Sequence, residues 1–204
     1  MTESSIGPQV EIAARQKAAD EFSIARSNAI NEYARLESHL AMIFEAISGA
    51  EIQRAYAMFA SITNSQTRMS TMKQLLNLSH GEKYDKFFDS LSVHLMGISK
   101  TRNKIVHWIA VQSYRGEQEF NPKTDISLAS HPDIFVNKHF YKHEIIDFTR
   151  KASFFAAITH RFAVNLKHPE LSRGNPDLRP WHEIFIEKIS YPPPSNHPYQ
   201  NNRR

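Results

Sequence analysis

The strongest constraint on the fold is a long repeat of apolar residues near the start of the chain. These residues recur at alternating gaps of three and four positions, which is the spacing of one face of an α-helix. The mean gap is about 3.5 residues, which favours a long helix packed lengthwise against other helices. Ser48 and Gly49 would end this helix. The repeat consists of Phe22, Ala25, Ala29, Tyr33, Leu36, Leu40, Ile43 and Ile47.

The same spacing predicts four more helices, over residues 51–60, 67–78, about 82–109 and about 141–167. Between the last two, the helical period is lost, and glycine and proline separate short stretches that could pair as a hairpin. The sequence therefore predicts an all-α fold, an antiparallel helical bundle over residues 1–168 with a short irregular or hairpin insertion at about 111–140. We expect the Pro-rich extension at 169–204 to dock one piece around Trp181 and to be disordered from Tyr191 onward.

Composition excludes several classes of protein. The 204 residues contain no cysteine, which rules out a disulfide framework, zinc thiolate sites and thiol catalysis and favours the cytoplasm. No apolar run approaches the roughly 20 residues that span a bilayer, and the first residues lack a signal-peptide pattern, so we expect no membrane role. The net charge of +4 and the pI near 9.3 are compatible with a nucleic-acid partner, but charge alone does not decide it.

The segment Arg102-Asn103-Lys104-Ile105-Val106-His107-Trp108 carries the chemistry. Arginine can bind a phosphate, and histidine can transfer a proton at neutral pH. Arg102 interrupts the apolar stripe of its helix, so it should either face a carboxylate such as Glu37 or open onto a polar cleft. Asn103 and His107 lie on one flank of the helix, whereas Arg102 is roughly 140° around the axis from His107. The long arginine side chain can lean across that angle.

These residue types fit RNA cleavage by the RNA's own 2′-hydroxyl group. That reaction needs a base, an acid and positive charge at the phosphate, and a histidine with a reference pKa of about 6.5 suits either proton transfer. Arg102 would stabilise charge on the phosphate, Asn103 would orient the arginine or the phosphate, and Lys100 and Lys104 could add phosphate contacts. The products would carry a 2′,3′-cyclic phosphate, and DNA would resist cleavage.

A helical bundle with Arg102, Asn103 and His107 near the end of a late helix resembles the HEPN superfamily (higher eukaryotes and prokaryotes nucleotide-binding domains). The signature of that family is an arginine, four to six residues and a histidine, and Asn103 matches a polar residue often found after the arginine. The resemblance implies a metal-independent endoribonuclease without a cofactor, active on RNA as a homodimer that joins both motifs in one cleft. It also implies roles such as a toxin or phage-defence effector, restrained by an antitoxin or another regulatory protein.

Other interpretations stay open at this point. An arginine-to-histidine spacing of this kind recurs at Arg161 and His168, so the spacing alone is weak evidence. The alternative function is a non-catalytic helical dimer that binds RNA, nucleotide or a protein partner, and burial of His107 against Trp108 would favour it.

A second group of residues has the spacing of metal ligands. His139, His143 and Asp147 follow each other at gaps of four, which would place them on one face if the last helix begins early enough. Their charged and aromatic neighbours are typical of an ordinary helix start. We therefore predict no metal site there.

Overall fold

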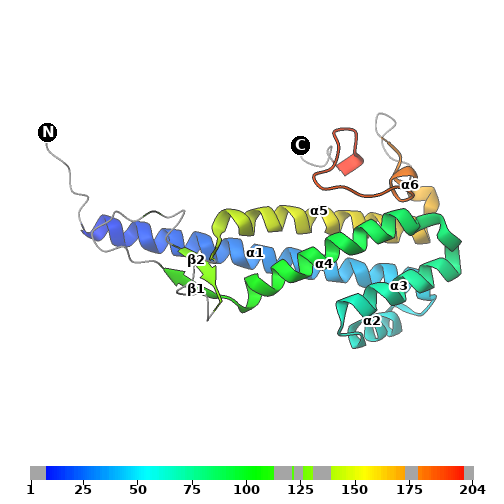
Figure 1. Cartoon of the computed structure of the whole chain (residues 1–204), viewed down its shortest axis with the longest axis horizontal. Helices are drawn as coiled ribbons and strands as arrows, with labels where there is room; N and C mark the ends of the chain where they lie inside the picture. The colour runs from blue at the N-terminus through cyan, green and yellow to red at the C-terminus, as the bar shows by residue number, and fades with distance from the viewer. Residues whose placement is uncertain (1–7, 113–120, 122–125, 131–138, 173–178, 200–204) are drawn as a thin grey trace. The chain divides into compact units, whose positions relative to one another are not determined.

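The computed structural model describes residues 8–112, 121, 126–130, 139–172 and 179–199. The chain is mostly helical, which confirms the predicted fold class. No helix in the described ranges is both long enough and apolar enough to cross a membrane. The helices are α1 (Pro8–Ser48), α2 (Ile52–Ser61), α3 (Ser65–His80), α4 (Asp85–His107), α5 (Lys142–Lys167) and α6 (Trp181–Ile184), with 3-10 turns η1 (Gly81–Tyr84) and η3 (Pro169–Ser172) (Figure 1).

The insertion before α5 is a small antiparallel sheet. Its strands β1 (Ile109–Gln112), β2 (Ile126–Ala129) and β3 (His139–Tyr141) pair in the order β1-β2-β3. The predicted hairpin corresponds to β1 and β2, and β3 was not predicted. The helix predicted at about 82–109 ends earlier than expected, because α4 stops at His107 and Ile109, which is 48% exposed, begins β1.

The described chain forms two compact units, and each of α1, α4 and α5 contributes to both. The first unit comprises residues 1–31 and 101–150, and the second comprises residues 32–100 and 151–204. In the first unit an ion pair joins Lys142 Nζ to Glu21 Oε2 at 2.6 Å. Its buried side chains in the described ranges come from α1, the end of α4, the sheet and the start of α5: Ala18, Phe22, Ala25, Ala29, Ile105, Ile126, Ser127, Leu128, Ala129, Phe140, Ile145 and Phe148.

The core of the second unit is rich in aromatic rings. Phe162 of α5 is fully buried and packs its ring against Phe87 and Phe185, with centroid distances of 4.8 Å and 5.0 Å. Trp181 of α6 stacks on Phe185 at 5.7 Å, and Phe185 contacts Phe162 of α5, so the piece around Trp181 packs on a helix of the bundle as predicted. Such ring pairs add to the free energy gained by burying apolar area.

The predicted disorder from Tyr191 onward is wrong for residues 191–199, because this segment packs on α5. Phe154 contacts the rings of Tyr191, His197 and Tyr199, with the last centroid at 4.9 Å. The aromatic side chains of this segment were the missed signal. The free energy gained by burying their apolar area can exceed the free energy lost because the neighbouring prolines donate no backbone hydrogen bond. Residues 200–204 lie outside the described part of the chain.

Burial of His197 predicts that acid destabilises the second unit. His197 is only 3% exposed, and burial together with the charge of Arg179 lowers its pKa to about 4. The unfolded chain, with a histidine pKa near 6.5, takes up this proton first, so stability present above pH 6.5 is lost as the pH falls towards 4. We expect a loss of up to about 3 kcal/mol from this residue, measured by urea unfolding at several pH values.

The control for this prediction is His197→Phe, which keeps an aromatic ring and removes the titration. The variant should show a shallower fall of unfolding free energy below pH 6.5. Equal pH dependence in the two proteins would exclude His197 as the cause.

A capping residue fixes the start of α3. Asn64 Oδ1 accepts a hydrogen bond from the backbone N–H of Thr67 at 2.9 Å, which satisfies one of the donors that a helix leaves unpaired at its N-terminus. Asn64→Ala should lower the unfolding free energy by about 1 kcal/mol, whereas Asn64→Asp should retain the cap and most of the stability. Thermal unfolding of the three proteins measures the difference, and an unchanged alanine variant would contradict it.

Candidate active site

The predicted motif occupies the last turns of α4 and its immediate exit. Arg102 is half-buried, and its Nη1 donates a hydrogen bond to Asn103 Oδ1 at 3.3 Å. Asn103, Lys104 and His107 are exposed, while Ile105 between them is fully buried and fixes this end of the helix in the core of the first unit. Lys100 is also exposed on α4, in the part of the helix that belongs to the second unit. The buried side chain of Ile105 therefore fixes a helix end at which Asn103 and His107 are exposed and Arg102 is half-buried.

Arg26 of α1 holds the end of α4 and was not identified from the sequence. Its Nε donates to the carbonyl oxygen of Ile105 at 2.8 Å, and its Nη2 donates to those of Val106 and Trp108 at 2.9 Å and 3.1 Å. The last carbonyl groups of a helix lack partners within the helix, and a cation there also opposes the helix dipole. Arg26 thus fixes the backbone on both sides of His107.

Trp108, the residue after His107, is also held by local contacts. The Nζ of Lys104 lies 5.3 Å from the centre of the ring of Trp108, a half-buried residue. The backbone N–H of Trp108 donates to the backbone carbonyl of Lys104 at 2.9 Å. Strand β1 begins directly afterwards at Ile109. The motif is therefore bounded by a capped helix end and by a paired strand.

The carboxylate of Glu37 has partners within the second unit, and the side chain of His107 is exposed. Glu37, the carboxylate considered as a partner for Arg102, accepts hydrogen bonds from Arg68 Nη1 at 3.3 Å and from the Tyr33 hydroxyl at 3.4 Å. His107 is exposed, so the burial against Trp108 that would favour the non-catalytic alternative is not observed.

The second arginine-to-histidine spacing has structural contacts. The Arg161 guanidinium lies 5.8 Å from the centre of the Trp181 ring, and His168 Nδ1 lies 3.4 Å from Glu170 Oε1. Arg161 therefore supports the docking of α6. These contacts explain this pair without any catalytic role.

The arrangement considered for metal binding does not form as one helical face. His139 lies in β3, and α5 begins only at Lys142, so His139 and His143 are not one turn apart on a helix. The Nδ1 of His139 instead makes a 2.8 Å hydrogen bond with the Ser127 hydroxyl. Among the residues that the structure describes, no three histidine, aspartate or glutamate side chains gather as a metal site.

A histidine pair in the second unit was also missed. His39 of α1 and His160 of α5 have ring centroids 4.9 Å apart, and His39 Nδ1 makes a 2.7 Å hydrogen bond with the carbonyl of Ala156. Burial is the main cause that lowers the pKa of both rings. Their separation by more than a hundred residues gave no local signal.

The chain was compared with known protein families, with characterised proteins and with solved structures. None of them matches. The resemblance to the HEPN superfamily therefore depends on Arg102, Asn103, His107 and their helical context.

Proposed function

We propose that this protein is a metal-independent endoribonuclease of the HEPN type, with Arg102, Asn103 and His107 as its catalytic residues. The observation that carries the proposal is that Asn103 and His107 are exposed and Arg102 half-exposed at a helix end whose carbonyl groups are bound by Arg26. Backbone fixed on both sides of His107 favours catalysis, because proton transfer requires the imidazole within hydrogen-bond reach of the substrate.

The proposed reaction is attack of a ribose 2′-hydroxyl on the adjacent phosphorus. A base removes the 2′-hydroxyl proton, the 2′-oxygen forms a bond to phosphorus, and the bond from phosphorus to the 5′-oxygen breaks. An acid gives a proton to the departing 5′-oxygen, which leaves a 2′,3′-cyclic phosphate and a 5′-hydroxyl. Arg102 would stabilise charge on the phosphate oxygens, with its guanidinium held by Asn103, and Lys100 and Lys104 would add phosphate contacts.

We further propose that two copies of the chain act together in the cytoplasm. A single His107 cannot serve as base and acid in the same step, so a homodimer that joins both motifs would supply the two histidines. Uncontrolled RNA cleavage is toxic, so an antitoxin or another regulatory protein would restrain the enzyme. Sedimentation of the purified protein tests the dimer directly.

The chemistry of the product ends tests the proposed function. With excess EDTA present, the protein should cut single-stranded RNA to 2′,3′-cyclic phosphate and 5′-hydroxyl ends, and it should leave DNA of the same sequence intact. Cleavage that requires a divalent cation, or that yields 5′-phosphate ends, would contradict the proposal.

A further inference from the structure

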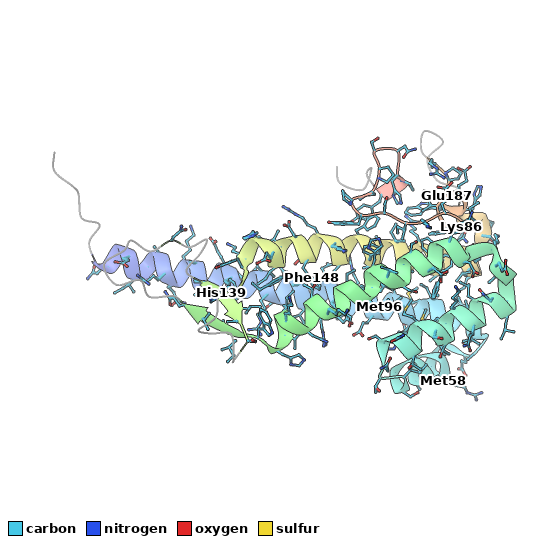
Figure 2. All side chains as sticks on the ribbon, viewed as in Figure 1. Met58, Lys86, Met96, His139, Phe148 and Glu187 are labelled. Atoms are coloured by element: carbon cyan, nitrogen blue, oxygen red, sulfur yellow. The ribbon has the colours of Figure 1, made fainter. Side chains whose placement is uncertain are left out.

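Three rings form a row in the first unit. His139 and Tyr141 lie in β3, and His143 lies at the start of α5. The His139 and Tyr141 ring centroids are 6.0 Å apart with planes inclined by 30°, and the Tyr141 and His143 centroids are 6.0 Å apart with planes inclined by 9°. We call these residues the ring row. His143 is exposed, and the other two are half-buried (Figure 2 labels His139).

One hydrogen bond holds the His139 ring, and a second holds the backbone at Tyr141. Ser127 is only 1% exposed, and its hydroxyl is bonded to His139 Nδ1 at 2.8 Å. The backbone N–H of Tyr141 donates to Glu144 Oε2 at 2.8 Å, which is one half of a capping box at the start of α5. Rings that are already fixed lose little conformational entropy when a ligand stacks on them.

The register of the sheet places the His139 end of the ring row nearest the motif, whereas Tyr141 lies level with Val111. Ile109 of β1 pairs with Ala129 of β2, and Ala129 pairs with His139 of β3. Neighbouring strands are about 4.8 Å apart, so the Cα atoms of Ile109 and His139 are separated by roughly 10 Å. Ile109 is the second residue after His107. An RNA strand at the motif could therefore reach the ring row within a few nucleotides.

We infer that the ring row is a stacking subsite for the bases of the single-stranded nucleic acid whose phosphates bind at Arg102. The inference rests on the proposed function and names how its substrate is held. Unpaired bases stack on aromatic and histidine side chains, and this contact tolerates any sequence because every base has a π-face. The neighbouring Lys142 is paired with Glu21, so the ring row offers surfaces for bases more than charge for phosphates.

Binding by an inactive protein tests the inference separately from cleavage. The His107→Ala protein serves as the parent, and fluorescence anisotropy measures its affinity for labelled single strands of about eight nucleotides, RNA and DNA of one sequence. Adding Tyr141→Ala should weaken the binding of both strands about tenfold, because stacking does not depend on the 2′-hydroxyl. Adding Tyr141→Phe should leave both affinities unchanged, because the ring remains.

Two further variants guard against a general loss of structure. His143→Ala removes an exposed ring and should also weaken binding, whereas Tyr56→Ala removes a half-buried ring of the second unit and should have no effect. Unchanged affinity in both Tyr141→Ala and His143→Ala overturns the inference, as does a loss for RNA alone or no RNA binding by the parent. The proposed function can survive each of these results, because it is judged by the cleavage products of the wild-type protein.

Discussion

His107→Ala is expected to reduce the rate of RNA cleavage by about 100-fold to 10,000-fold, the usual contribution of a positioned proton-transfer group. The side chain is exposed at the last residue of α4, so its removal should leave the free energy of unfolding within about 0.5 kcal/mol of the wild type. A loss of activity would then reflect chemistry and not folding. Initial rates on a labelled RNA oligonucleotide, together with thermal unfolding, measure both quantities.

The matched control is His182→Ala, because His182 is an exposed histidine on the short helix α6. This variant should cut RNA at the wild-type rate and should pass through the same purification. Equal rates for the wild-type and His107→Ala proteins would assign the activity to a contaminant or to another site.

Arg26→Ala is expected to lower both the stability of the protein and its rate of RNA cleavage. It removes three charge-assisted hydrogen bonds from the carbonyl groups of Ile105, Val106 and Trp108. Loss of these bonds should lower the free energy of unfolding by about 2 to 3 kcal/mol, because part-buried carbonyl groups would lose their partner. The end of α4 should fray, and RNA cleavage should fall because His107 is no longer held.

Two substitutions separate the cap from a simple loss of charge. Arg15→Ala removes an arginine of the same helix whose pairing with Glu11 is an exposed contact between adjacent turns, so it should cost under about 0.5 kcal/mol. Arg26→Lys should recover only part of the stability, because an ammonium group lacks the planar fork of the guanidinium. Urea unfolding ranks the four proteins, and equal stability of Arg26→Ala and the wild type would refute the capping role.

The helices could be predicted because their signals are local. Phe22, Leu36 and Ile47 mark a buried face by their spacing alone, and α1 and α3 each end at a glycine with a positive φ, +66° at Gly49 and +59° at Gly81. The same local spacing showed that Arg102 interrupts an apolar stripe, but it left the exposure of His107 open.

Contacts between distant parts of the chain could not be predicted in this way. The bond from Arg26 to the carbonyl of Ile105 joins residues 79 positions apart, and nothing beside Arg26 in the sequence indicates its partner. His139 was considered for the last helix because its spacing fits one, but the Glu144 bond to Tyr141 starts α5 later, and pairing with β2 takes His139 into the sheet. Single-sequence spacing cannot choose between these outcomes.

The most direct test of the central claim uses a DNA oligonucleotide that contains one ribonucleotide, with EDTA present. The wild-type protein should cut only on the 3′ side of that ribonucleotide and leave a 2′,3′-cyclic phosphate there, because only that position has a 2′-hydroxyl. The His107→Ala protein should leave the strand intact over the same period. Cleavage elsewhere in the strand, or cleavage by both proteins at one rate, would contradict a ribonuclease centred on Arg102 and His107.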